Sequence, residues 1–307
     1  MKTLLLIDGN GVMHRAYHAL PLFKTKNGFP TNAMFGFFSI LYKVVKDYQP
    51  DYLIVCFDTP VPTFRKKVFK EYQAQRPKID DELAVQFKVT KEALNKAGIA
   101  HIEKEGFEAD DLIGTLVRRF KKENLRILIL SGDRDILQLI NKNVYVITPS
   151  IGYSKSKIYD KEEVIKKFNV KPEQITDFKA LVGDNSDNYS GAKGIGPKIA
   201  SKLINKYHSI DSIYKNLEKI PEKIRIILQE SKENVYLSLQ LAKILSDAPI
   251  ENINLESVKF EGFHHDLKYF LLKYEIKSIT ERIFNDEKNP IKEKGEKKID
   301  QSQISLF

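Results

Sequence analysis

Short apolar runs alternate with longer amphipathic stretches over the first half of the chain. The runs have the length of buried strands and occupy residues 3–7, 52–57, 126–130 and 144–147. The stretches between them predict helices, among them residues 32–48, 81–97 and 109–122. This alternation predicts an α/β fold in which helices flank a central, mainly parallel sheet. Ligands bind such sheets beyond the carboxyl ends of the strands.

Beyond about residue 160 the pattern becomes mainly helical. Pro172 stands at the start of one predicted helix, Gly183 ends it, and the glycine-rich GAKGIG precedes the next. Residues 287–302 are charged and lack apolar periodicity, so we expect a disordered linker there. We therefore predict an α/β domain at residues 1–170 and a helical region at residues 171–286. The linker follows at residues 287–302, and a pentapeptide at residues 303–307 ends the chain.

The size and net charge of the chain indicate what kind of molecule it binds. The chain has 307 residues, of which 42% are hydrophobic, and it carries a net charge of +9. A basic protein of this size favours a polyanion, and no long apolar run suggests a membrane. The single cysteine, Cys56, lies inside an apolar run, so we expect it to be a core residue. We expect a cytoplasmic monomer that binds nucleic acid.

Acidic residues stand where strands end or helices begin. They occur in five motifs, LLLIDGNG, LIVCFDTP, FEADDLIG, LILSGDRD and GDNSDN. The nine acids are Asp8, Asp58, Glu108, Asp110, Asp111, Asp133, Asp135, Asp184 and Asp187. Helix capping would explain one or two of them, but acids gathered at one edge either become protonated or hold divalent cations. An all-oxygen set without Cys or His suits Mg²⁺ or Mn²⁺. This pattern predicts a metal-dependent phosphoryl-transfer enzyme and points to a nuclease.

Two further segments suit a nucleic acid. In GAKGIGPKIASKL, Gly194 and Gly196 allow the backbone to approach a phosphate, and K⁺ could be held by loop carbonyls. Residues 64–78 interleave basic and aromatic side chains, which suits a single strand, although a solvated basic face is the alternative. The candidate DNA-binding residues are Arg15, Arg65, Tyr72, Gln73, Lys193, Gly194, Gly196 and Lys198.

The motifs in their order resemble the 5′-nuclease family, which includes the N-terminal nuclease domain of bacterial DNA polymerase I and the flap endonucleases. The resemblance covers residues 1 to about 285 and rests on IDGNGVMHRAYHAL, GFPTNAMFGF, CFDTPVPTFR, FEADDLIGTL, LSGDRDILQL and ALVGDNSDNYSGAKGIGPKIA. It implies a helical arch at about residues 64–100 and a helix–three-turn–helix DNA module at about 178–206. No polymerase domain follows, so the chain resembles a free-standing member.

The same resemblance implies two metal sites. One would use Asp8, Asp58, Glu108, Asp110 and Asp111, and the other Asp133, Asp135, Asp184 and Asp187. The family's arch motif reads Tyr-Lys-x-x-Arg, but Gln73 stands here in place of the lysine, and Tyr189-Ser190-Gly191 replaces Ile-Pro-Gly. Lys70, Gln73 and Arg76 would share one face of a helix, so we assign catalytic roles to Arg76 and Lys70.

The predicted function is a structure-specific 5′-3′ exonuclease or flap endonuclease that hydrolyses DNA near 5′ ends with two metal ions, in replication and repair. A non-catalytic DNA-structure-binding protein and an RNA-directed nuclease on hybrid duplexes are the alternatives. The last five residues resemble the bacterial sliding-clamp-binding motif. Gln303, Leu306 and Phe307 would make that contact, with the two apolar side chains filling a pocket.

Overall fold

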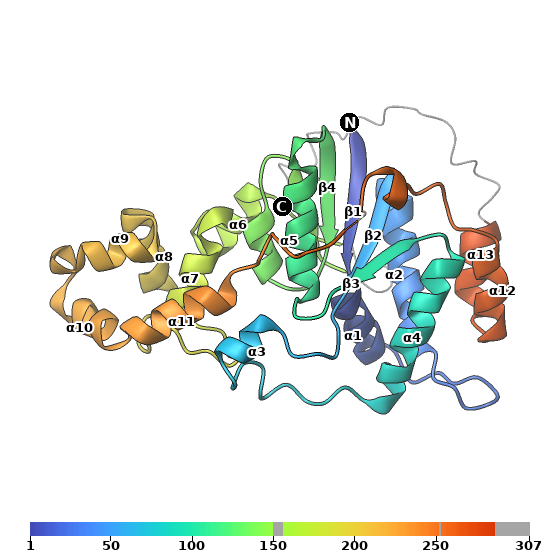
Figure 1. The fold of residues 1–307 in the computed structure, drawn as a ribbon, viewed down its shortest axis with the longest axis horizontal. Helices are drawn as coiled ribbons and strands as arrows, with labels where there is room; N and C mark the ends of the chain where they lie inside the picture. The colour runs from blue at the N-terminus through green and yellow to red at the C-terminus, as the bar shows by residue number, and fades with distance from the viewer. Residues whose placement is uncertain (150–155, 252, 286–307) are drawn as a thin grey trace.

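A sheet of six strands forms the centre of the molecule (Figure 1), which a computed structural model describes over residues 1–149, 156–251 and 253–285. The strands are β1 (Lys2–Asp8), β2 (Tyr52–Phe57), β3 (Ala100–Glu103), β4 (Leu125–Leu130), β5 (Val144–Ile147) and β6 (Ile158–Tyr159). Their order across the sheet is β3-β2-β1-β4-β5-β6, and every pair is parallel except β5 with β6. The predicted α/β fold with a mainly parallel sheet is confirmed.

Alternate residues of the central strands pack into two separate hydrophobic cores, one on each face of the sheet. Leu4 and Leu6 of β1 pack into the core on one face, together with α5 (Ala109–Arg119) and helices of the C-terminal half. Leu5 and Ile7 point to the other face. There they meet α1 (Gly9–Ala19), α2 (Asn32–Tyr48), α4 (Asp81–Lys96), α12 (Asp266–Lys273) and α13 (Lys277–Asn285). Burial on both faces explains why the strands read as continuous apolar runs.

The strands end together at one edge, which brings their following residues close to each other. Asp8 pairs in register with Cys56, and Ile7 with Leu130, so the chain leaves β1, β2 and β4 at similar heights. Asp8 then begins α1, because its carboxylate accepts a hydrogen bond of 2.8 Å from the amide of Gly11. The predicted meeting of acidic segments at this edge follows from this register.

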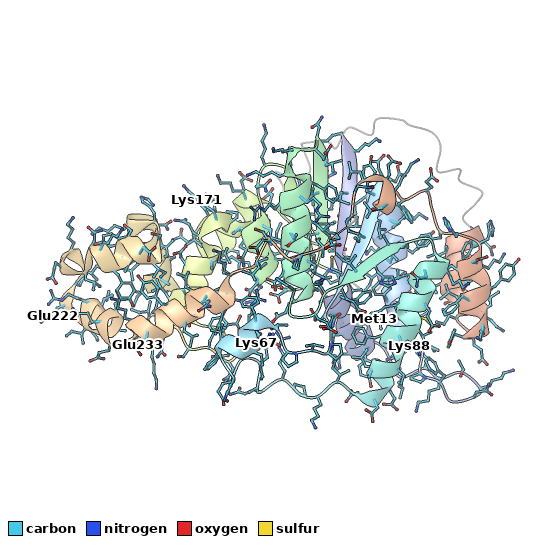
Figure 2. The ribbon with its side chains drawn as sticks, in the orientation of Figure 1. Met13, Lys67, Lys88, Lys171, Glu222 and Glu233 are labelled. Carbon is cyan, nitrogen blue, oxygen red and sulfur yellow. The ribbon has the colours of Figure 1, made fainter. Side chains whose placement is uncertain are left out.

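The segment expected to form the arch runs from the end of β2 to α4, along the lower side in Figure 1. It starts with the short helix α3 (Phe64–Val68), continues as turns over residues 70–75, and becomes regular only in α4. Gln73 has φ of +54°, so Lys70, Gln73 and Arg76 do not share a helix face as predicted. Lys67 of α3 and Lys88 of α4, both labelled in Figure 2, lie on the two helices that these turns connect.

A helical region extends away from the sheet, to the left in Figure 1. It contains α6 (Lys161–Phe168), α7 (Ile175–Val182), α8 (Pro197–Tyr207), α9 (Ile210–Lys215), α10 (Glu222–Glu230) and α11 (Lys232–Ala242). Short 3₁₀ turns complete the chain at residues 120–122, 135–139, 172–174, 217–219 and 256–258. No helix among the described residues is long and apolar enough to span a membrane. The predicted linker and clamp-binding peptide lie outside the described residues.

Candidate active site

One cleft at the carboxyl edge of the sheet gathers most of the predicted acids. It has a volume of about 960 Å³ and is lined by Asp8, Asp58, Glu108, Asp110, Asp133, Asp135 and Asp187. Asp184 does not line the cleft, but its carboxylate lies within 4.8 Å of those of Asp135 and Asp187. Within the described residues, Asp111 is the one acid of the nine that neither lines the cleft nor belongs to this cluster.

Neutral donors hold the acids that follow β1 and β2. Asp8 accepts a 2.8 Å hydrogen bond from Ser131 Oγ, which ties β1 to the residue after β4. Asp58 accepts one of 2.6 Å from the amide of Ala109 at the start of α5. Asn10 orients the same turn by accepting from the amide of Asp58 at 3.0 Å. These contacts fix the carboxylates without neutralising them.

Glu108 and Asp110 reach the cleft from the start of α5. Glu108 accepts hydrogen bonds from Thr63 Oγ1 at 2.8 Å and from the Tyr72 hydroxyl at 3.3 Å. Asp110 points one oxygen at Arg65, 3.8 Å away. Its other oxygen, Oδ1, is buried and has no hydrogen-bond partner among the described residues.

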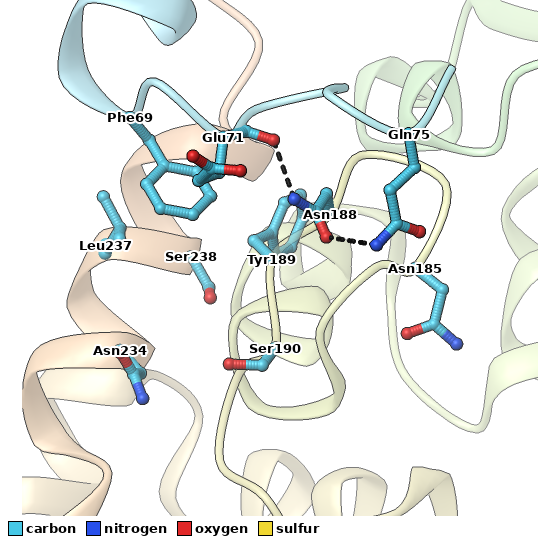
Figure 3. Close-up of a pocket in the computed structure, with 10 residues that line it drawn as sticks. All are labelled: Phe69, Glu71, Gln75, Asn185, Asn188, Tyr189, Ser190, Asn234, Leu237 and Ser238. Carbon is cyan, nitrogen blue, oxygen red and sulfur yellow. Dashed lines mark hydrogen bonds between the residues drawn. The ribbon is translucent and has the colours of Figure 1, made fainter. Parts of the chain in front are cut away.

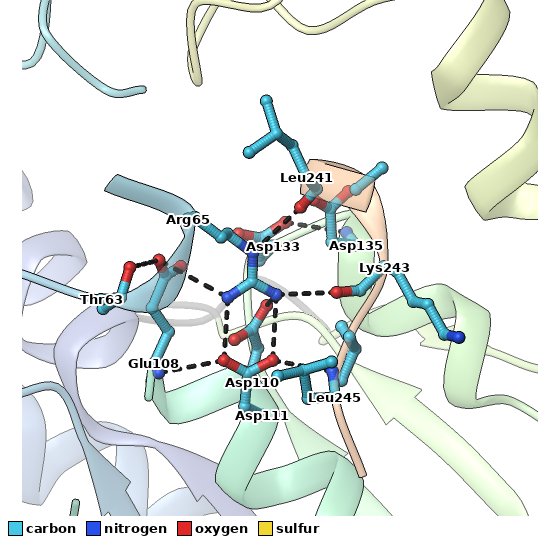
Figure 4. A network of polar contacts seen from close by, with 12 residues as sticks. Thr63, Arg65, Glu108, Asp110, Asp111, Asp133, Asp135, Leu241, Lys243 and Leu245 are labelled. Atoms are coloured by element: carbon cyan, nitrogen blue, oxygen red, sulfur yellow. Dashed lines mark hydrogen bonds and ion pairs between the residues drawn. The ribbon is translucent and has the colours of Figure 1, made fainter. Parts of the chain in front are cut away.

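Asp111 faces the interior instead of the cleft (Figure 4). The Arg65 guanidinium donates to both of its oxygens, at 2.8 and 2.9 Å, and the amide of Leu245 donates to one of them at 2.8 Å. Arg65 also donates to the carbonyls of Leu241 and Lys243. With its oxygens occupied, Asp111 fits a structural role better than the ligand role suggested by the sequence.

Lys179 lies among three acids of the second predicted metal site, Asp135, Asp184 and Asp187. Its ammonium contacts Asp135 Oδ1 and lies 2.6 Å from Asp184 Oδ2. Sequence reasoning missed this residue, because a lysine in the last turn of a helix is ordinarily a surface residue favoured by the helix dipole.

Residues of the turn after α3 converge on Asp187 and Asn188. Arg76 donates to Asp187 Oδ1 at 2.7 Å, and the side-chain amide of Gln73 donates to the same oxygen at 3.1 Å. The backbone carbonyl of Glu71 accepts a 2.8 Å hydrogen bond from Asn188 Nδ2 (Figure 3). The turn therefore closes one side of the cleft and is anchored to the loop that carries the last two acids.

Burial makes ionisation of these acids costly. It raises the pKa of Asp58 to about 6, with a further contribution from the charge of Asp8. It raises the pKa of Glu108 to about 7, although the charge of Arg65 acts in the opposite direction. Burial also raises the pKa of Asp135 to about 7 despite Lys179, and raises that of Asp110 well above its usual range.

This donor set fits divalent cations with oxygen ligands. Buried carboxylates with raised pKa values gain stability in their charged form when a cation lies beside them. Three buried polar atoms at or beside the site also lack partners among the described residues: Thr59 Oγ1, Asp110 Oδ1 and the Tyr189 hydroxyl. An ion or its water would satisfy such atoms.

The structure separates the predicted DNA-binding residues into two groups. Arg15, Tyr72 and Gln73 line the cleft, as does the predicted catalytic residue Arg76, half of whose side chain is exposed. Arg65 and Tyr72 are only 1% and 4% exposed, so both present little surface to DNA in this conformation. Lys70 is exposed but does not line the cleft, whereas Lys66 does. Of these two lysines, Lys66 is therefore the one at the cleft.

The glycine-rich hairpin lies between α7 and α8. Lys193 and Lys198 are exposed there, and Gly194 has φ of +102°, which favours glycine. Gly196 is the N-cap of α8, Pro197 occupies its first turn, and no acidic residue lies in that turn. The hairpin and the first turn of α8 therefore present backbone amides and lysines without competing carboxylates.

The cleft is lined by acids at the edge of an α/β sheet, and basic residues and a helical module lie beside it. These features are those of a metal-dependent phosphodiesterase. Two family profiles match the chain, one described as "5′-3′ exonuclease, N-terminal resolvase-like domain" over residues 3–169. The other is described as "5′-3′ exonuclease, C-terminal SAM fold" and covers residues 170–266. The chain belongs to the 5′-3′ exonuclease family, and the predicted family is confirmed.

Individual relatives agree with this assignment. A 5′-3′ exonuclease of Aquifex aeolicus is 42% identical over 284 residues, covering 92% of this chain and 96% of that protein. DNA polymerase I of Caldicellulosiruptor bescii is 43% identical over 283 residues, which cover 91% of this chain but 33% of the polymerase. The chain thus spans about a third of that polymerase.

Solved structures share the fold at low identity. The T5 D15 protein co-crystallised with metal ions superposes with a TM-score of 0.64 at 21% identity, covering 92% of this chain and 99% of that one. The catalytic core of Rad2 in complex with a DNA substrate gives a TM-score of 0.60 at 16% identity, with coverage of 93% and 92%.

Proposed function

We propose that this protein is a structure-specific 5′-3′ exonuclease and flap endonuclease that hydrolyses DNA phosphodiester bonds near 5′ ends. The single observation that carries the proposal is the cleft in which seven predicted acids meet beneath a basic turn. Membership of the 5′-3′ exonuclease family agrees with it. Work on flaps and primers in DNA replication and repair, in the cytoplasm and as a monomer, is part of this proposal.

The acids divide into two groups that would each hold a divalent cation. Asp8, Asp58, Glu108 and Asp110 would serve one, and Asp133, Asp135, Asp184 and Asp187 the other. Such ions, when bound, would supply positive charge that assists hydrolysis of a phosphodiester. Because every ligand is a carboxylate oxygen, we propose Mg²⁺ or Mn²⁺ as the ion.

The side chains around the acids would bind and orient DNA. Arg76 and Lys66 extend from the segment before α4, and Arg15 extends from α1, so cations approach the cleft from two sides. Their charges would contact phosphate oxygens and offset the repulsion between DNA and the acids. The hairpin before α8 would hold the duplex part of the substrate, and we keep K⁺ there as a proposed ligand of its carbonyls.

A cleavage-product map on 5′-flap, nicked and RNA–DNA hybrid substrates tests the proposed function. We expect Mg²⁺-dependent cuts near the 5′ end of the DNA flap and no products in excess chelator. Binding of the flap without cleavage at any Mg²⁺ or Mn²⁺ concentration would instead support a non-catalytic DNA-structure-binding protein. A strong preference for the RNA strand of the hybrid would support an RNA-directed nuclease.

Removal of the hairpin lysines should weaken duplex binding in a manner that depends on salt. Lys193→Ala and Lys198→Ala should each lower affinity and reduce the slope of log affinity against log salt by about 1, because each exposed lysine releases counterions from a phosphate. Fluorescence anisotropy on a flap substrate in Ca²⁺, over a range of salt concentrations, measures both quantities. Lys259→Ala, at the amino-terminal end of β2, is the control, and an equal loss of slope in that variant would contradict the assignment.

We also propose that the last five residues bind a bacterial sliding clamp. The support is their sequence, in which Gln303 is followed by an apolar residue, a small residue and the pair Leu306 and Phe307. Deletion of residues 303–307 should abolish clamp binding and clamp-stimulated cleavage but leave cleavage of bare DNA unchanged. Surface plasmon resonance on immobilised clamp measures the first effect, and retained affinity in the truncated protein would refute the proposal.

A further inference from the structure

Lys179 reaches the second group of acids because of how α7 ends. The helix stops at Gly183, whose amide donates to the carbonyl of Lys179 at 2.7 Å. Gly183 has φ of +80°, and a Cβ there would lie 2.6 Å from the backbone of Ser190. Only glycine allows this sharp turn, which brings Asp184 back beside the side chain of Lys179.

The ammonium of Lys179 is buried among the acids that it contacts. The side chain is 13% exposed, and those of Asp135 and Asp184 are 10% and 19% exposed. Its ammonium contacts Asp135 Oδ1 and lies 2.6 Å from Asp184 Oδ2. Arg76 pairs with the third acid, Asp187. Two protein cations therefore offset two of the four formal negative charges of Asp133, Asp135, Asp184 and Asp187.

The other half of the cleft is arranged differently. Asp8 and Asp58 accept hydrogen bonds from Gly11, Ser131 and Ala109, all of which are uncharged donors. Arg65 lies 3.5 Å from Glu108 and 3.8 Å from Asp110, but its hydrogen bonds go to Asp111 and to backbone carbonyls. No described lysine lies between the acids of this half as Lys179 does between Asp135 and Asp184.

We propose that Lys179 is an internal counter-ion that weakens the binding of a divalent cation to Asp135, Asp184 and Asp187. The two halves of the acidic cleft then bind divalent cations with unequal affinity, and the half that contains Asp8 and Asp58 binds its ion at the lower concentration. The physical reason is that the ammonium engages an oxygen of two of the three ligands and repels an incoming cation at short range. This inference rests on the proposed function, because it takes these three acids as metal ligands.

Calorimetric titration of the full chain with Mn²⁺, without DNA, tests the proposal. The wild-type protein should show a tight and a weak binding step. Lys179→Met should tighten the weak step by about ten-fold or more, since loss of one unit charge at a few ångströms is worth more than about 1.4 kcal/mol at a partly buried site. Lys179→Arg keeps the charge and should leave the weak step weak.

Two further variants locate the effect. Lys259→Met removes a positive charge at the amino-terminal end of β2, the opposite end of the strands from the acids, and should not change either step. Asp184→Asn added to Lys179→Met should abolish the gain, because it removes one of the three ligands. If Lys179→Met does not fold without metal, Lys179→Gln should show the same tightening, because it also lacks the charge.

Unchanged or weaker Mn²⁺ binding in the folded Lys179→Met or Lys179→Gln variant would overturn the proposal. Cleavage of a 5′ flap by the wild-type protein is measured separately with Mg²⁺. A wild-type protein that binds Mn²⁺ in two unequal steps but does not cut would refute the proposed function and leave the counter-ion role standing. A wild-type protein that cuts, together with unaltered Mn²⁺ isotherms in the variants, would refute only the counter-ion role.

Discussion

Asp110→Asn should lower the single-turnover rate of flap cleavage by a factor on the order of 10² or more, because loss of even an outer-shell group at a metal site costs about 10–100-fold. The substitution keeps the shape of the side chain and removes one charge from the acids of the cleft. Asp110 is suited to this test because its Oδ1 atom is buried without a partner among the described residues, so no protein hydrogen bond to that atom is lost.

The same variant should be at least as stable as the wild type in the absence of metal. Burial raises the pKa of Asp110 well above its usual range, so the folded state favours the uncharged form. An acid with a raised pKa stabilises the fold at low pH, and this stability is lost as the pH rises past the pKa of an unfolded aspartate towards that of the folded one. An amide does not ionise and avoids this loss.

Two measurements decide the outcome for Asp110. Quenched-flow cleavage in Mg²⁺ gives the rate, and thermal melting with and without Mg²⁺ gives the stability gained from the ion, which should shrink in the variant. Asp47→Asn changes an exposed aspartate in the last turn of α2 and serves as the control. Near wild-type cleavage by Asp110→Asn would remove this residue from the metal ligands.

Arg65→Met should lower the free energy of unfolding by about 3–5 kcal/mol, because it leaves a buried carboxylate without its partner. The pair is bidentate and buried, and Arg65 also satisfies the carbonyls of Leu241 and Lys243. These bonds join the start of α3 to α5, to the last turn of α11 and to the residue after it, so their loss should loosen the cleft as well. Urea denaturation monitored by circular dichroism measures the change.

Matched variants separate the loss of this buried pair from the loss of a positive charge. Arg225→Met removes an arginine that makes only long or exposed ion pairs with Glu218 and Glu222, and should change stability by less than about 1 kcal/mol. Arg65→Met combined with Asp111→Leu should recover part of the lost stability, since apolar pairs can replace buried ion pairs. Asp111→Asn alone should be destabilising. If it keeps full stability and loses cleavage, the ligand role that the sequence suggested is correct.

Local patterns were sufficient to predict most of the regular structure before α6. The helix at Asn32–Tyr48 and the strands Tyr52–Phe57 and Val144–Ile147 have the bounds that the apolar pattern predicted. The turn at residues 70–75 was the clearest miss. Its sequence contains good helix formers, but Gln73 adopts φ of +54° while its backbone amide donates to Asp187 from a distant loop. Long-range contacts override helix propensity there.

The amino-acid sequence by itself determined the class of fold, the edge at which the acids meet and the family, because apolar periodicity and short acidic motifs are local properties. Only the tertiary structure showed which acids already have charged protein partners. Asp110 and Asp111 are adjacent in sequence, yet one lines the cleft and the other is neutralised by Arg65. Lys179 enters the acidic cluster through the fold alone. Electrostatic pairing depends on distances between segments far apart in the chain, which no local pattern encodes.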